Sequence, residues 1–124
     1  TPSELQRRSE KGTKQPDAVW LKDGLRMALE VELSAKWSRA LDQFVAGYVA
    51  ALSGTTTGEQ SRFDQLLLLS DSPAILARYK KAISPGANFG VWQKDDSRHW
   101  VQIGTRKVPA SVEGKLICKL IETE

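Results

Sequence analysis

The sequence predicts a mixed α/β domain in which helices pack against a central sheet. Residues 25–33 alternate between apolar and polar side chains, as a strand with one buried face does. Residues 35–52 instead repeat apolar side chains every three or four positions, which is typical of a helix. The two kinds of segment then alternate along the chain. With 124 residues, 40% of them hydrophobic and 27% charged, the composition is that of an ordinary globular domain with one core.

The first predicted elements are a short N-terminal helix and a β-hairpin. Ser3 suits the N-cap of the helix, although a frayed basic arm is an equal alternative for this segment. Strands follow over residues 18–21 and 25–33. The Asp23-Gly24 pair between them is a strong signal for a tight hairpin turn.

Side chains of the second strand should alternate between two faces. We expect the apolar set to lie against the core and the polar set to face away from it. The apolar set comprises Leu25, Met27, Leu29, Val31 and Leu33, and the polar set comprises Arg26, Ala28, Glu30 and Glu32.

The rest of the chain continues as alternating helices and strands. Ser34 is expected to cap a helix that ends near Gly54. A buried strand over residues 63–69 leads to a second helix, with Ser72 as its cap and Pro73 as its first residue. The remaining expected elements are strands over 89–93 and 100–103 around a polar turn, and a tail over 110–121 that favours a helix slightly over a strand.

Composition argues against membrane and disulfide-rich classes. Unbroken apolar runs such as Leu66–Leu69 are far shorter than the ~20 residues that cross a bilayer, and no apolar leader opens the chain. The single cysteine, Cys118, allows neither an internal disulfide nor a thiolate metal cluster, which favours a reducing, cytoplasmic location. A net charge of +3 permits a polyanionic partner without requiring one. Because the chain starts at Thr1 rather than Met, we expect residues 1–124 to be a single domain from a larger protein.

Three carboxylates gather on the predicted hairpin. Asp17 stands at the start of the first strand, and Glu30 and Glu32 share one face of the second. Like charges this close repel one another, and a hard divalent cation relieves that repulsion. The pattern therefore indicates a Mg²⁺ site.

Basic and polar groups follow directly in the next predicted helix. Lys36, Arg39 and Gln43 are spaced three and four residues apart, so they should project from one side of it. The free N–H groups and positive dipole end of a helix N-terminus receive phosphate well. Carboxylates for a metal, a lysine and a phosphate-binding helix end together suit phosphodiester hydrolysis.

Structural explanations compete with this reading. A Glu-x-Glu pair on a strand is most often a solvated face, and basic residues in a first helical turn are usually surface residues. Arg78, Lys80 and Lys81 form a basic helix face that either tracks a phosphate backbone or is simply solvated. Tryptophans can stack on nucleobases, but core packing is the better prediction for Trp20 and Trp37.

The order Pro16-Asp17, Glu30-x-Glu32 and Lys36 resembles the PD-(D/E)xK nuclease superfamily. The wider stretch from Pro16 to Lys36 also resembles the replication-relaxation family of plasmid and mobile-element proteins. The resemblance covers about residues 4–48. It implies a restriction-endonuclease-like core with a mixed central sheet flanked by helices.

Carried over by position, the resemblance implies that Asp17 and Glu30 bind the metal, Mg²⁺ or Mn²⁺. Glu32 occupies the position of the family's catalytic lysine. Either a glutamate serves there, as in some restriction enzymes, or Lys36 reaches back from its helix to supply the ammonium. Gln43 corresponds to a supporting polar residue. The acidic residue of the superfamily's first helix corresponds to Glu4 or Glu10.

The leading hypothesis is a DNA-processing domain of a plasmid replication or mobilisation protein, with a metal-dependent nuclease-like site. Its catalytic residues are Glu32, Lys36 and Gln43, and its DNA-binding residues are Arg39, Arg78, Lys80 and Lys81. The alternatives are a catalytically inactive nuclease-fold domain that binds DNA or a protein partner, and a scaffold domain of a larger assembly. The acidic Glu32 in the lysine position favours the inactive domain.

Overall fold

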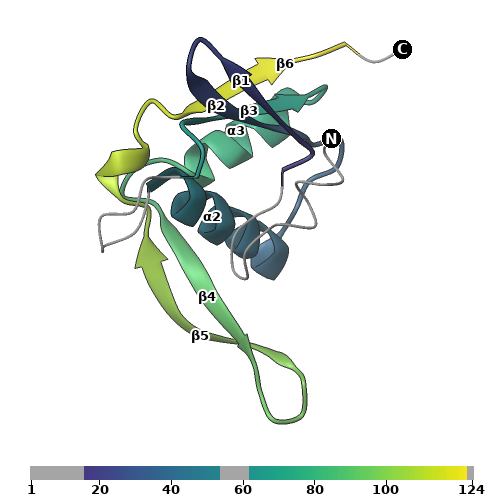
Figure 1. Ribbon diagram of the computed structural model, residues 1–124. Coiled ribbons are helices and arrows are strands. Elements are labelled where there is room, and N and C mark those ends of the chain that lie inside the picture. The colour runs from purple at the N-terminus through teal and green to yellow at the C-terminus, as the bar shows by residue number, and fades with distance from the viewer. Residues whose placement is uncertain (1–15, 54–61, 123–124) are drawn as a thin grey trace.

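A computed structural model describes residues 16–53 and 62–122 (Figure 1). The helix expected near Ser3, together with Glu4 and Glu10, lies outside the described residues. In chain order the elements are β1 (Ala18–Lys22), β2 (Leu25–Val31), α2 (Ser38–Ser53), β3 (Gln65–Ser70), α3 (Pro73–Ala82), β4 (Asn88–Lys94), β5 (Trp100–Lys107), the short 3₁₀ helix η1 (Ala110–Val112) and β6 (Leu116–Leu120).

The expected α/β class is confirmed as a mixed four-stranded sheet flanked by two helices. The strand order is β1-β2-β3-β6, and β4 and β5 form a separate two-stranded ribbon. β1 is antiparallel to β2, whereas β2, β3 and β6 run parallel to one another. α2 connects β2 to β3, and α3 lies between β3 and β6 in the chain. Because both crossovers step across the sheet in the same direction, they place both helices on the same face of it.

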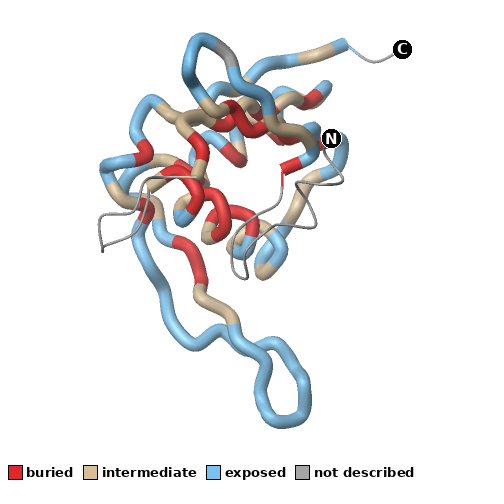
Figure 2. The backbone as a smooth tube through the Cα atoms, in the orientation of Figure 1, coloured by how far each residue is buried: buried red, intermediate tan, exposed pale blue. Residues whose placement is uncertain are grey.

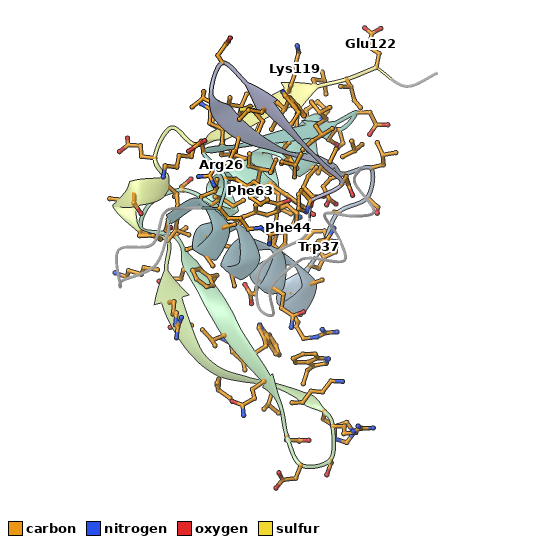
Figure 3. The ribbon with its side chains drawn as sticks, viewed as in Figure 1. Arg26, Trp37, Phe44, Phe63, Lys119 and Glu122 are labelled. Carbon is orange, nitrogen blue, oxygen red and sulfur yellow. The ribbon has the colours of Figure 1, made fainter. Side chains whose placement is uncertain are left out.

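The core fills the space between that face and the two helices. Leu66 and Leu68 of β3 are fully buried there. The Phe44 ring of α2 lies 5.1 Å from the Tyr79 ring of α3, so the helices also pack on each other. Figure 2 shows the buried segments gathered between the sheet and α2. Phe44 and Phe63 point into this space, whereas Lys119 and Glu122 point away from it on the other side of the sheet (Figure 3).

The face of β2 that lies against the core is the opposite of the one expected. Ala28 and Glu30 are 0% and 2% exposed, whereas Val31 is 38% exposed. The register explains this inversion, because Ala28 and Glu30 lie beside the buried Leu66 and Leu68. The face that carries Ala28 and Glu30 is thus covered by α2. On the opposite face Met27 is buried, whereas Leu25 and Val31 are exposed.

One predicted boundary and one predicted element type are also wrong. α2 begins at Ser38 rather than after Ser34, because the carbonyl of Trp37 accepts the first helical N–H bonds. The slight preference for a helix in the tail fails as well, because β6 pairs with β3 along its whole length. Pairing in the sheet outweighs such weak local periodicity.

Trp20 and Trp37 were expected in the core, but they are 36% and 61% exposed. No helix among the described residues is long and apolar enough to cross a bilayer.

Replacing Leu68 tests the assignment of the core. Because its side chain is fully buried, Leu68→Ala is expected to lower the free energy of unfolding by about 2–5 kcal/mol. Urea denaturation followed by circular dichroism measures the change. Leu120→Ala is the matched control, since Leu120 is 54% exposed and its loss should cost well under about 1 kcal/mol. Equal losses in the two variants would contradict the assignment.

Candidate functional site

The turn between β1 and β2 sets the position of the first carboxylate. Asp23 and Gly24 have φ angles of 51° and 80°, the left-handed values that a tight hairpin turn requires. The register that follows pairs Ala18 with Leu29, so Asp17 stands opposite Glu30 at the end of the ladder. The Asp17 N–H donates to the carbonyl of Leu29 (3.0 Å), and Asp17 Oδ2 accepts a hydrogen bond from the N–H of Val31 (2.9 Å). The carboxylate is therefore braced against the neighbouring strand.

Glu30 is buried and hydrogen-bonded to a tyrosine. The Tyr48 hydroxyl, on α2, donates to Glu30 Oε1 over 2.6 Å. Burial raises the pKa of Tyr48 well above its usual value, and the charge of Glu30 raises it further, with smaller effects from Asp17 and Glu32. Three carboxylates thus act on one hydroxyl, and the phenol stays protonated as a hydrogen-bond donor.

Glu32 forms an ion pair with Lys36. The Lys36 ammonium lies 2.8 Å from both carboxylate oxygens of Glu32. The glutamate side chain is 7% exposed and the lysine side chain 32% exposed. The Tyr79 hydroxyl donates to Glu32 Oε2 (3.3 Å) and accepts from the backbone N–H of Lys36 (3.3 Å). Burial raises the pKa of Tyr79, and the charge of Glu32 adds to the shift.

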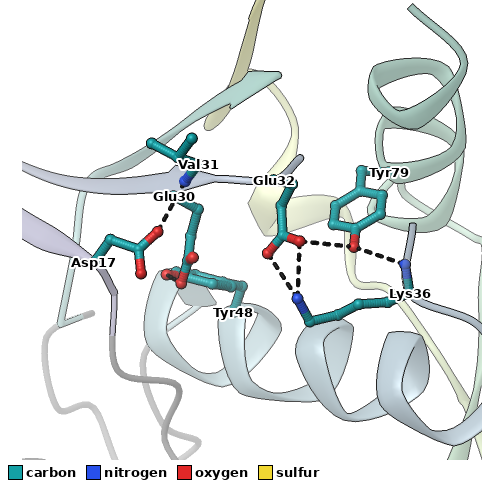
Figure 4. A network of polar contacts seen from close by, with 7 residues as sticks. All are labelled: Asp17, Glu30, Val31, Glu32, Lys36, Tyr48 and Tyr79. Carbon is teal, nitrogen blue, oxygen red and sulfur yellow. Dashed lines mark hydrogen bonds and ion pairs between the residues drawn. The ribbon is translucent and has the colours of Figure 1, made fainter. Parts of the chain in front are cut away.

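Four of the residues singled out from the sequence therefore meet on one side of the hairpin, facing α2: Asp17, Glu30, Glu32 and Lys36 (Figure 4). One of the two alternatives from the sequence was that Lys36 reaches back to the position of Glu32, and its ammonium does contact that side chain. It does so from the connector between β2 and α2, however, and not from the helix.

Gln43 and Arg39 extend this group along α2. Lys36, Ala40, Gln43 and Phe44 border a hollow of about 250 Å³ beside the ion pair. Arg39 Nη1 donates to Gln43 Oε1 over 3.1 Å. The expected run of Lys36, Arg39 and Gln43 is therefore present, with its first member placed before the helix.

The predicted basic face of α3 is divided. The Arg78 guanidinium stacks 3.2 Å from the centre of the Trp37 ring. Arg78 and Lys81 border a cavity of about 610 Å³ with Leu41. Lys80 instead borders a different hollow and lies near Cys118, whose pKa is raised by burial and lowered by the lysine charge. The three cations do not line one surface.

Two residues of the site were missed from the sequence, Tyr48 and Tyr79. Tyr48 lies in the apolar repeat of α2 and Tyr79 in that of α3, so the sequence pattern marks both only as core aromatics. They are core residues by burial, each 0% exposed, yet each also carries a hydroxyl to a carboxylate. The only signal for this role is that both tyrosines lie beneath the acidic face of β2. That signal could be used only if this face were known to be the buried one.

Among the described residues, no group of three or more His, Cys, Asp or Glu side chains forms a metal-binding cluster. Asp17, directly before β1, and Glu30 of β2 still offer hard oxygen donors. Mg²⁺ commonly uses one or two carboxylates and completes its shell with water and substrate phosphate, so the donor set fits this ion.

Comparison with known proteins adds no family: no protein-family model, no curated protein and no solved structure matches the chain.

The tyrosines predict a stability loss at alkaline pH. Both have pKa values raised in the folded state, so their contribution is complete below about pH 10 and is lost as pH rises towards the folded pKa. Each protonated tyrosine should steepen the fall in unfolding free energy above pH 10 by up to about 1.4 kcal/mol per pH unit. Urea denaturation across this range measures the slope. Tyr48→Phe should remove one such contribution and lower the stability at neutral pH by about 1–3 kcal/mol. Parallel curves for the two proteins would contradict the prediction.

The Glu32–Lys36 pair predicts strong coupling in a double-mutant cycle. Lys36→Met leaves a buried carboxylate without its ammonium and should cost about 1–3 kcal/mol, less than for a fully buried pair because the lysine is partly exposed. Adding Glu32→Gln to Lys36→Met removes the unpaired charge and should restore part of that loss. Urea denaturation of the four proteins gives the coupling energy. Additive effects would show that the pair is not a unit.

Proposed function

We propose that this chain is a DNA-processing domain that cleaves phosphodiester bonds with a divalent metal. The observation that carries the proposal is the ammonium of Lys36 at Glu32, two residues after Glu30. A PD-(D/E)xK strand carries its lysine at the position of Glu32. Here the acid at that position holds an ammonium delivered by Lys36, so the site keeps the two metal-binding acids, Asp17 and Glu30, and one lysine, with Glu32 as a third acid.

The roles follow from the positions of the side chains. Asp17 and Glu30 hold Mg²⁺ or Mn²⁺, which when bound makes water more acidic and stabilises the charge developing on the phosphate. Tyr48 donates to Glu30 and fixes the orientation of its carboxylate. Glu32 accepts the proton of the attacking water as a general base, and its contacts with the Lys36 ammonium fix the position of that carboxylate. Gln43 borders the hollow in which a phosphate oxygen would lie.

The fold is compatible with a restriction-endonuclease-like core. An acidic hairpin followed by two parallel strands and their helices supports that assignment. With the resemblance to the replication-relaxation family, it points to a plasmid or mobile-element protein that acts in the cytoplasm. The lone cysteine, Cys118, suits that reducing compartment.

The second candidate is a nuclease-fold domain without catalytic activity that binds DNA or a protein partner. The observation that favours it is the ion pair itself, because both oxygens of Glu32 contact the Lys36 ammonium. A lysine whose charge is balanced in this way stabilises an anionic transition state less well than an unpaired one.

A cleavage assay separates the two candidates. The domain is incubated with supercoiled and single-stranded DNA in Mg²⁺ or Mn²⁺, and nicked product is followed on gels. Asp17→Asn, Glu30→Gln and Glu32→Gln should each reduce the rate, by about 100-fold for the general base Glu32. Glu113→Gln is the matched control, since Glu113 is an exposed acid near η1, outside the site.

Equal nicking by wild type and all variants would show a contaminating nuclease and overturn the assignment of activity. DNA binding without any cleavage by the wild type would favour the inactive domain instead.

A further inference from the structure

The ribbon of β4 and β5 projects from the body of the domain. This β4–β5 arm (residues 88–107) extends away from the four-stranded sheet, beyond the end of α2 (Figure 1). All eight residues of β5 are exposed, and the outer part of the arm is exposed on both strands (Figure 2). Phe89, at the base of the arm, belongs to the core, but the rest of the arm buries little of itself, which suggests that it contacts a partner.

The base of the arm is fixed to α2. The Trp92 indole N–H donates to Asp42 Oδ2 over 2.8 Å. Gly90 permits this contact, because a Cβ atom at its position would lie 2.5 Å from Asp42 Oδ2 and 2.9 Å from the indole nitrogen. The direction of the arm is therefore set by a specific close approach to the helix.

One face of the arm, here called its inner face, is directed towards the first turns of α2. Cross-strand pairing puts Trp92 beside Gln102 and Lys94 beside Trp100, all on the same face. The Arg39 guanidinium of α2 lies 4.6 Å from the centre of the Trp100 ring, and the Lys94 ammonium lies 5.3 Å from it. Trp100 thus holds two cations from two separate elements close together.

A series of side-chain contacts connects these cations to the candidate active site. Lys36 and Gln43 border one hollow, Gln43 bonds Arg39, and Arg39 stacks on Trp100 beside Lys94. Successive neighbours therefore lead from the Glu32–Lys36 pair to the arm. Three of them, Lys36, Arg39 and Lys94, are cationic.

We propose that the inner face of the β4–β5 arm and the first turns of α2 bind the backbone of duplex DNA, with the arm lying in a groove beside the cleaved phosphate. A two-stranded ribbon is one of the elements that the major groove admits. The arm carries four Lys or Arg residues against Asp95 and Asp96. Asp95 Oδ1 accepts hydrogen bonds from the N–H groups of Ser97 and His99, so this acid is engaged within its own turn. The inference takes its ligand class from the proposed function, but it does not require cleavage.

Binding is measured by fluorescence anisotropy with a labelled DNA duplex and EDTA present, so that cleavage plays no part. Arg39→Gln combined with Lys94→Gln should weaken binding about 10-fold or more, and the slope of log K against log salt should become less steep by about 0.9 for each phosphate contact removed. Lys119→Gln is the matched control, since it removes an exposed lysine from β6, and its affinity should match the wild type within about 2-fold.

Gly90→Ala tests the geometry separately from the charge. It keeps every cation, but the added Cβ forces Asp42 or the Trp92 indole to shift, so affinity should fall while net charge is unchanged. Circular dichroism and urea denaturation establish that the body remains folded. If Gly90→Ala or another arm variant proves unfolded, the Arg39→Gln and Lys94→Gln single variants decide the question.

Equal weakening by Lys119→Gln, or an unchanged salt slope in the double variant, would overturn the inference in favour of diffuse attraction. A wild-type dimer that Trp100→Ala dissociates would overturn it by assigning the arm to a second copy of the chain. Asp17→Asn should retain binding in EDTA. If the wild type binds DNA through the arm but does not cleave it, only the proposed activity is refuted. If it cleaves DNA but its binding does not depend on the arm, only this inference is refuted.

Discussion

Burial of charge beneath α2 is the constraint on which the rest of the structure depends. The face of β2 that meets the helix carries Glu30 and Glu32, and a carboxylate taken out of water must find donors or a counter-ion. Tyr48 supplies a donor from α2, and Lys36 supplies the counter-ion from the connector. Tyr79 adds a donor from α3. The two helices are therefore held to the sheet by polar contacts at the same places where their aromatic rings pack, so the candidate site and the core share their supports.

Local signals predicted those elements whose ends are fixed by local chemistry. Asp23-Gly24 marked the hairpin because few residues accept its left-handed backbone. Ser72 marked the start of α3, and its hydroxyl does accept the N–H of Ile75. Ser34 carried the same type of signal and failed, because the connector contacts α3 and stays non-helical up to Trp37. Capping residues are common outside helices, so the sequence alone does not distinguish the two cases.

The sequence predicted which charged residues form the candidate site, but not that its acids are buried. The two-residue period of a strand correctly put Glu30 and Glu32 on one side, and the hairpin put Asp17 opposite Glu30. Alternation does not tell which face a helix will cover, so the burial of the acids was missed. Their phenol donors were missed as well, because a tyrosine at a core position does not reveal which group its hydroxyl contacts. The arm was expected only as two ordinary strands, since its separation from the sheet is a property of the tertiary fold.

The parallel order of β2, β3 and β6 has a consequence for how the protein reaches its native state. The β1–β2 hairpin joins neighbours in sequence and can form early, but Leu66 must find Leu116 across the whole of α3 and the β4–β5 ribbon. Such distant pairings slow folding, because a long loop must close before any contact compensates for the lost entropy. During synthesis on the ribosome, the edge of β3 therefore waits unpaired until β6 emerges, and this edge is the place where a nascent chain would first need protection from aggregation.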